Sequence, residues 1–172
     1  MKVHGFKRLQ YLLPCLLFFT AFGCGYQFIG AKALPFQSVT IMPVKNKTHE
    51  PYLEEKLHDA LSREFIANNI RVMTYGGDIE LTATVTTFEL STIAARDEKV
   101  QEQAITMRVD VRIIDKKDKV IEFTSLQSPI KITFQAVGAV SAAVVQKEKA
   151  VDKACTETAR ELLSRLALRY AK

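Results

Sequence analysis

The residues best suited to chemistry are few, and they do not form a recognisable catalytic set. His49 and His58 are the only histidines after position 23, and neither belongs to a group of metal ligands with a familiar spacing. The sequence contains no glycine-rich phosphate loop, no nucleophile elbow and no arrangement of cysteine with histidine. Its carboxylates fall mostly on faces expected to be solvated, where nothing would shift their pKa values toward catalysis. We therefore expect no enzymatic activity, no metal ion and no cofactor.

The first 23 residues are typical of an export signal that is later removed. A basic start precedes an apolar run over residues 9–22, and its basic residues are Lys2, Lys7 and Arg8. This run is too short for a transmembrane helix, which needs about 20 apolar residues, and Pro14 would disturb its helix. We predict that residues 1–23 form a signal peptide.

Cys24 follows this leader directly, in a segment that resembles the recognition motif of lipoprotein signal peptidase. In Ala21-Phe22-Gly23-Cys24 the small Gly23 permits cleavage before the cysteine, whose thiol then carries diacylglycerol. Several buried acyl chains, at about 0.8 kcal/mol for each CH₂ group, make such an anchor effectively permanent. Gly25 is not the Asp that retains enterobacterial lipoproteins at the inner membrane, so the resemblance implies lipid anchoring at the cell outer membrane. The alternative is an ordinary secretory leader with a cysteine nearby.

Removal of the leader changes the charge and the cysteine content of the chain. The full chain has 24 basic and 19 acidic residues, and loss of the leader leaves 21 basic residues and a net charge of +2. We see no basic patch and expect no nucleic-acid partner. With Cys15 removed and Cys24 acylated, Cys155 is the only thiol left. Its place on an apolar helix stripe favours a buried, inert thiol over a reactive or intermolecular one.

A single α/β domain over residues 38–172 follows a lipidated tether over residues 24–37. Residues 38–44 read as a strand, and a helix is expected to start near Pro51, because proline suits the first helical turn. Residues 70–74 read as a second short strand. A strand, helix and strand in this order place the two strands parallel when they share a sheet.

Two-residue alternation from Ile79 onward predicts a long antiparallel meander. The expected strands cover residues 79–90, 105–113, 120–124 and 130–134, with a charged turn at residues 96–102. The alternation slips at Thr86-Thr87, for which a β-bulge is the simplest cause. Pro129 argues for an edge strand or a bulge at its position, because proline cannot donate a ladder hydrogen bond.

The last predicted element is a long amphipathic helix over residues 141–171. Its apolar stripe contains Val144, Val151, Cys155, Leu162 and Leu166. At 1.5 Å per residue the helix is roughly 45 Å long and must cover much of the sheet. Together the elements predict an α+β fold, a two-layer sandwich of a mixed, mostly antiparallel sheet of four to five strands with two helices packed on one face.

Three stretches of the mature chain resemble the LptE family of lipopolysaccharide-assembly lipoproteins. They are Cys24-Gly25-Tyr26, the strand Val39 to Val44 with the following Asn46 to Glu54, and the turn Gly77-Asp78 with the strand that follows it. The family usually has Gly after the Glu-Pro pair, where this chain has Tyr52. The resemblance implies a plug inside the outer-membrane β-barrel LptD that helps the barrel assemble and binds lipopolysaccharide on its way to the surface.

The sheet face without helices is the expected contact surface for such partners. It carries Arg108, Asp110, Arg112, Lys131 and many threonines. A barrel lumen is polar, and Arg or Lys can bind the phosphates of lipid A, Arg in a bidentate fashion. The loop Arg96-Asp97-Glu98-Lys99 is a second candidate contact, since it joins two long strands. The alternative is a simply solvated face, which one-sided antiparallel sheets normally show.

Two other functions stay open at this point. A periplasmic lipoprotein that activates a cell-wall synthase, or that belongs to a secretion assembly, would keep the anchor and change the task. A soluble periplasmic enzyme would require a concave pocket with convergent polar groups.

Overall fold

The computed structural model describes residues 34–96, 99–116, 120–124, 126, 130–135 and 140–170. The chain divides into two units, Met1–Gly30 and Ala31–Lys172, and all described residues belong to the second. Its elements are β1 (Ser38–Ile41), β2 (Lys45–Asn46), α2 (Leu53–Ala67), β3 (Arg71–Met73), β4 (Ile79–Arg96), β5 (Lys99–Asp115), β6 (Val120–Phe123), β7 (Ile130–Gln135) and α3 (Val140–Tyr170). The predicted signal peptide and Cys24 therefore lie outside the described residues.

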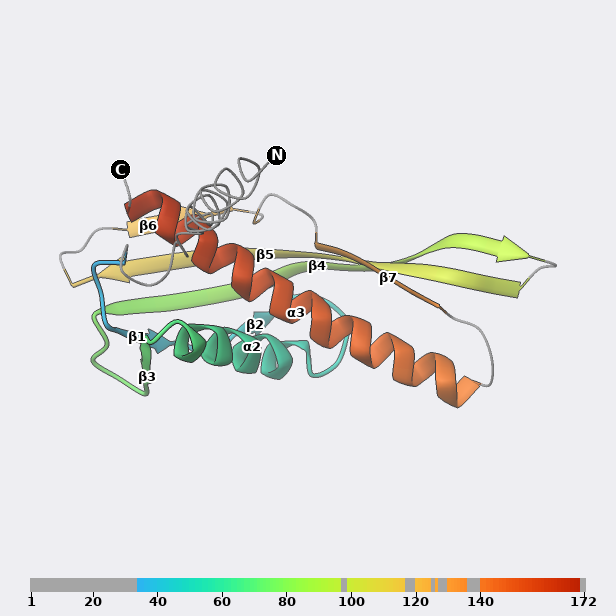
Figure 1. Cartoon of the computed structure of the whole chain (residues 1–172), viewed down its shortest axis with the longest axis horizontal. Coiled ribbons are helices and arrows are strands. Elements are labelled where there is room, and N and C mark those ends of the chain that lie inside the picture. The colour runs from blue at the N-terminus through green and yellow to red at the C-terminus, as the bar shows by residue number, and fades with distance from the viewer. Residues whose placement is uncertain are drawn as a thin grey trace, which may run out of the picture. The chain divides into compact units, whose positions relative to one another are not determined.

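One mixed sheet of seven strands forms the first layer. Its order is β3-β1-β4-β5-β6. The strand β2 pairs with β4 further along that strand than β1 does, and β6 and β7 pair with different stretches of β5. The pairs of β1 with β3 and β4 are parallel, as the strand, helix and strand order predicts, whereas β5 pairs antiparallel with β4, β6 and β7. In Figure 1 the β4–β5 hairpin extends well beyond the remaining strands.

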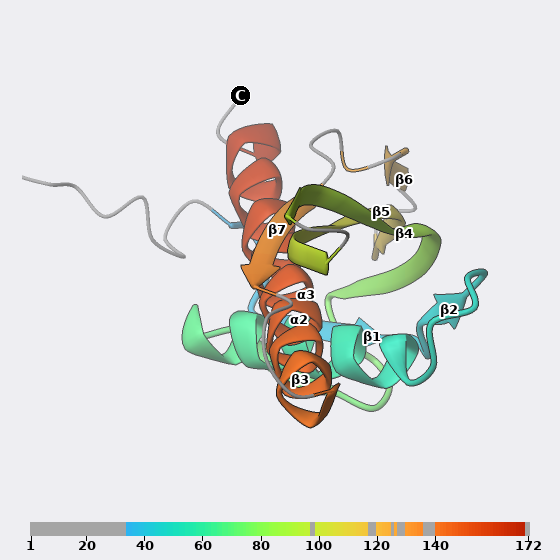
Figure 2. The same cartoon turned by 90° about the vertical axis from the view of Figure 1, so that its right-hand side faces the viewer.

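Both helices lie on the same face of this sheet and contact each other, so the predicted α+β fold is confirmed. In Figure 2, α3 crosses over α2 and continues along β7. The sheet has more strands than the expected four to five. The difference arises because β2 is too short and polar to show a periodicity, and because β6 and β7 pair with β5 at separate levels.

The core lies between the helices and the alternate residues of β4 and β5 that face them. Leu57, Leu61 and Phe65 of α2 pack with the fully buried Leu81 and Ile113. A register shift between Val85 and Thr87 confirms the predicted bulge. It returns the apolar residues of β4 to the helix side after the extra residue Thr86.

The helix expected to start near Pro51 begins at Leu53, with Tyr52 at its N-cap position. Two other predicted details were wrong. The charged segment at residues 96–102 is mostly strand, since Arg96 pairs with Lys99 and the ladder of the hairpin continues to that point. Val144 is 54% exposed, because the first turns of α3 extend past α2 (Figure 1). Pro129 lies outside the described residues.

Candidate functional site

The face of the sheet opposite the helices is polar where β5 crosses its centre. Arg108, Asp110 and Arg112 alternate along β5 with the buried Val109 and Val111. Strand geometry places the Cα atoms of the two arginines about 13 Å apart, with the aspartate between them. The face therefore presents two exposed guanidinium groups and a carboxylate in one row.

Arg112 already has a partner on this face. Its Nε atom lies 3.5 Å from Oε1 of Glu122 on β6, and both side chains are more than half exposed. An exposed pair of this kind contributes at most about 1 kcal/mol. A phosphate or a carboxylate of a partner can therefore replace Glu122 at little cost.

The other predicted contact residues are placed only in part. Arg96 and Lys99 pair with each other at the end of the hairpin, and Lys131 pairs with Thr106 on β5. Their side chains lie outside the described part of the structure, and so does Cys24. The backbone places Lys131 beside Thr106, two residues from Arg108 along β5, whereas Arg96 and Lys99 lie at the far end of the hairpin.

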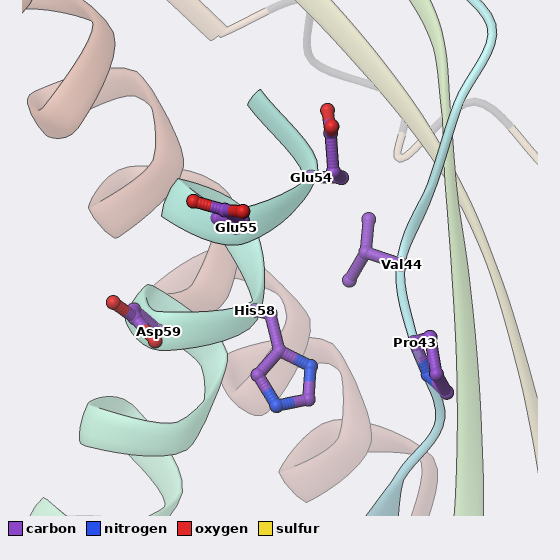
Figure 3. Close-up of a pocket in the computed structure, with 6 residues that line it drawn as sticks. All are labelled: Pro43, Val44, Glu54, Glu55, His58 and Asp59. Carbon is purple, nitrogen blue, oxygen red and sulfur yellow. The ribbon is translucent and has the colours of Figure 1, made fainter. Parts of the chain in front are cut away.

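The hollow between α2 and the segment after β1 is open and does not resemble an active site. It has a volume of about 430 Å³ and is lined by Pro43, Val44, Glu54, Glu55, His58 and Asp59. Figure 3 shows the His58 ring on the side of the helix that faces Pro43, whereas the Asp59 carboxylate lies on the other side of the helix. Its polar groups therefore do not converge on one point.

The chemistry of the hollow agrees with this geometry. Glu54 has a pKa below its usual value, because its own backbone N–H and the Asn46 amide donate hydrogen bonds to the carboxylate. A carboxylate of this kind stays ionised and is a poor general acid. Among the described residues, no group of three or more His, Cys, Asp and Glu side chains is arranged to hold a metal ion.

Asn46 organises the loop that leads from β2 into α2. Its Nδ2 donates to the backbone oxygen of Glu50 at 2.7 Å and to Oε2 of Glu54 at 2.9 Å. Its Oδ1 accepts from the backbone N–H and the hydroxyl of Thr48 at 2.9 and 2.8 Å. The Glu50 carboxylate then binds Nζ of Lys147 on α3 at 2.8 Å. The Asn-Lys-Thr-His-Glu stretch is thus a structural motif that ties this loop to α3.

Asp78, directly before β4, joins the start of β4 to the start of β1 and the end of β5. Its Oδ2 accepts from the backbone N–H groups of Gln37 and Ser38 at 3.0 and 3.1 Å and from the Ser38 hydroxyl at 2.9 Å. Its Oδ1 accepts from Nζ of Lys116 at 2.7 Å. These donors, the Lys116 ammonium first, hold the pKa of Asp78 well below its usual range.

Gly77 is required by the close approach of β1. A Cβ atom at this position would lie 2.6 Å from the backbone nitrogen of Thr40 and 2.7 Å from the backbone carbon of Val39. The sequence predicted only a turn here, whereas Gly77 and Asp78 also fix this turn against β1 and Lys116. The available signal was the adjacency of Gly77 to an Asp directly before a buried strand.

Cys155 is 1% exposed, as the sequence predicts. Burial, followed by the nearby Asp152 charge, raises its pKa to about 12. The thiol is therefore protonated at neutral pH and is a poor nucleophile.

A family model described as LptE, lipopolysaccharide-assembly, matches residues 36–166, which is more than half of the chain. The chain belongs to the LptE family. Membership assigns it a role in lipopolysaccharide assembly, and LptE proteins are non-enzymatic lipoproteins. Of the functions considered from the sequence, family membership therefore favours lipopolysaccharide assembly. No curated protein matches the sequence closely enough to be counted as a relative.

Solved structures share the LptE fold at low sequence identity. Rare lipoprotein B from Shewanella oneidensis is 14% identical with a TM-score of 0.55, over 77% of this chain and 95% of that one. Lipoprotein B from Nitrosomonas europaea is 17% identical with a TM-score of 0.54, over 85% and 90%. A protein from Xanthomonas campestris is 17% identical with a TM-score of 0.52, over 80% and 88%.

The residue after Glu50-Pro51 has an unusual backbone conformation. Tyr52 lies in the left-handed region with φ 59° and ψ 10°, where glycine has no steric cost. Glycine, which the resemblance to the LptE family leads us to expect at this position, would therefore suit the backbone better than tyrosine does. Within the described residues, no helix has both the length and the apolar character needed to cross a bilayer.

Proposed function

We propose that this LptE protein is an outer-membrane lipoprotein that occupies the lumen of an LptD-type β-barrel, assists its assembly and binds lipopolysaccharide. The family match over residues 36–166 carries the proposal. It covers nearly the whole described domain, including the polar row of β5.

The two faces of the domain support this role. The helix layer buries the apolar residues of β4 and β5, which leaves the opposite face with threonines, Arg108 and Arg112. A barrel lumen is polar, so a plug needs a polar surface against it. Guanidinium groups also bind phosphates in a bidentate fashion.

Attachment to the membrane is part of the same proposal. Residues 1–23 are removed as a signal peptide, Cys24 carries the acyl chains, and residues 24–37 tether the domain 38–172. A Cys24→Ala variant should leave the membrane fraction, and persistence of this variant in membranes at high salt would count against the anchor.

The test of the barrel partner is co-purification. The tagged full-length chain, extracted from membranes in mild detergent, should bring the LptD-type barrel with it. Depletion of the chain should reduce both the folded barrel and the lipopolysaccharide at the cell surface. Recovery of a cell-wall synthase in place of the barrel would support the alternative function.

The test of lipid binding is a charge reversal on the polar face. The double variant Arg108→Glu and Arg112→Glu should bind purified lipopolysaccharide at least about tenfold more weakly, as expected when two charge-assisted contacts are lost. The double variant Arg63→Glu and Lys149→Glu is the matched control, because it makes the same change in net charge at two exposed positions of the helix layer. Equal weakening by both changes would show that only net charge matters.

A further inference from the structure

The edge of β4 is open over its second half. On the side away from β5, β1 pairs with Ile79–Leu81 and β2 pairs with Thr84 and Val85. The last bond on this edge joins the backbone N–H of Lys47 to the oxygen of Val85 at 3.0 Å. Beyond Val85, no described strand pairs with this side of β4. Residues 89–94 are exposed.

The open edge contains a regular stretch between two irregularities. The register with β5 is continuous from Thr87 to Thr92, and it shifts before Thr87 and after Thr92. Paired residues of an antiparallel ladder alternate in the direction of their backbone groups. The outward oxygen of Val85 and this alternation direct the N–H and C=O groups of Phe88, Leu90 and Thr92 toward the open side. Six residues are the length of an average strand.

This stretch lacks the features that usually protect a strand edge. Natural edges are short, charged, interrupted by proline or covered, yet residues 87–92 contain one charge, Glu89, and no proline or lysine. The other outer strands are protected. The strands β3 and β6 have three and four residues, and β7 borders a hollow lined by Lys149 and Lys153 of α3.

The side chains of the stretch are also incompletely covered. Leu90 is 44% exposed although its partner in register on β5, Ile105, is fully buried. Ile93, just beyond the regular stretch, is 46% exposed. An additional strand beside β4 would cover Leu90 with one of its own side chains and satisfy the outward backbone groups.

We propose that the open edge of β4 between Thr87 and Thr92 receives an extended segment of the barrel polypeptide as an additional β-strand. This inference rests on the proposed function, which supplies the barrel as partner. Only a peptide backbone offers donors and acceptors at the two-residue repeat of about 6.8 Å that this edge requires.

The chemistry of the segment follows from both partners. The strands of a closed barrel have no free edge, so the segment is a loop or a terminal region of the barrel chain. It carries an apolar residue beside Leu90. A neutral or basic residue beside Glu89 is expected, because like charges on adjacent strands are unfavourable.

The experiment is amide hydrogen exchange on the full-length chain, alone and in the complex co-purified with the barrel. The amides of Phe88, Leu90 and Thr92 should exchange in the free chain and slow by roughly tenfold or more in the complex. A complex in which these amides exchange as fast as in the free chain overturns the inference and leaves the proposed function intact. Absence of any complex overturns both.

Two further measurements test whether another molecule occupies the edge. Protection that increases with the concentration of the free chain would identify a second copy as the partner and overturn the inference. If purified lipopolysaccharide protects these amides without the barrel, the ligand of this edge is a lipid, and the inference is overturned.

A pair of proline variants tests the edge directly. Leu90→Pro removes an outward N–H of β4, and Thr133→Pro removes an N–H on the outer side of β7, by the same alternation along β5. Only Leu90→Pro should reduce recovery of the barrel, by about tenfold or more. Equal recovery with both variants, each with the native circular dichroism spectrum, would overturn the inference.

Discussion

The two ends of the β4–β5 hairpin are built differently. In the first half, which we call the body (β1, β2, β3, α2, Gly77–Val85 and Val109–Asp115), alternate residues of the hairpin are fully buried and β1 pairs with β4 on its other side. In the second half, the arm (Thr86–Arg96, Lys99–Arg108 and β7), β4 has one described neighbour and Leu90 and Ile93 are half exposed.

The body and the arm are expected to serve different purposes, the stability of the fold and the binding of a partner. The segments around Asn46 and Gly77-Asp78, on which the resemblance to the LptE family was based, lie in the body and hold strand ends and helices together. The arm uses the same backbone pairing without that support. Changes in the body are therefore expected to lower the free energy of unfolding, whereas changes in the arm are expected to affect partner binding.

The largest effect is expected for Gly77→Ala in the body. The added methyl group would collide with the backbone of Val39 and Thr40, and backbone cannot move aside as a side chain can. We expect a loss of about 3 kcal/mol in the free energy of unfolding, measured by urea denaturation.

The neighbouring glycine is the control for that change. Gly76 has φ +71° and open space around its Cβ position, so Gly76→Ala should cost only about 1 kcal/mol from backbone conformation. If the two variants are equally stable, the close approach of β1 is not what requires Gly77.

Asp78→Asn should lower the free energy of unfolding by about 2 kcal/mol, because a carboxylate that accepts four hydrogen bonds becomes a neutral amide. Asp59→Asn on the exposed side of α2 is the matched control and should stay within about 0.5 kcal/mol of the native protein.

The same change has a pH signature. The pKa of Asp78 is lowered in the folded state, so its contribution is present above the unfolded value of about 3.9 and is lost as the pH falls through the folded value. Urea denaturation from pH 6 to pH 2 should therefore show a steeper acid loss in the native protein than in Asp78→Asn. Parallel profiles would contradict the lowered pKa of Asp78 in the folded protein.

Lys147→Met tests the tie between α3 and the loop before α2. It leaves the Glu50 carboxylate, whose side chain is 11% exposed, without its ammonium partner. We expect a loss of about 1 kcal/mol in the free energy of unfolding. Lys149→Met, at an exposed position two residues later, should change it by less than about 0.5 kcal/mol. An equal loss in both would make the effect one of helix charge.

The body was easier to predict from the sequence than the arm. Apolar residues at helical and two-residue spacing place α2 and the first half of β4, and the slip of the alternation locates the bulge at Thr86, where the body ends. These patterns are strong because burial on one face selects the residue type at every second or every third to fourth position.

The arm and the polar face were harder to predict because burial on one face constrains their residue types less. The segment at residues 96–102 is charged and exposed like a turn, yet the backbone ladder extends β4 to Arg96. The row of Arg108 and Arg112 was predicted from alternation alone, whereas its ion pair with Glu122 depends on the register of β6. No local pattern encodes that register.

Tyr52→Gly is expected to have the smallest effect, and in the opposite direction. A left-handed conformation costs a non-glycine residue about 1–2 kcal/mol, and glycine loses about 0.5–1 kcal/mol through the greater freedom of the unfolded chain. Tyr52 is 66% exposed, so little packing is lost, and the free energy of unfolding should rise by about 0.5 kcal/mol. Tyr52→Ala is the control, because alanine keeps the strain and should give no gain. In a regular helix or strand glycine would be the less stable of the two, so a glycine variant below the alanine variant in urea denaturation would show that Tyr52 is not strained in solution.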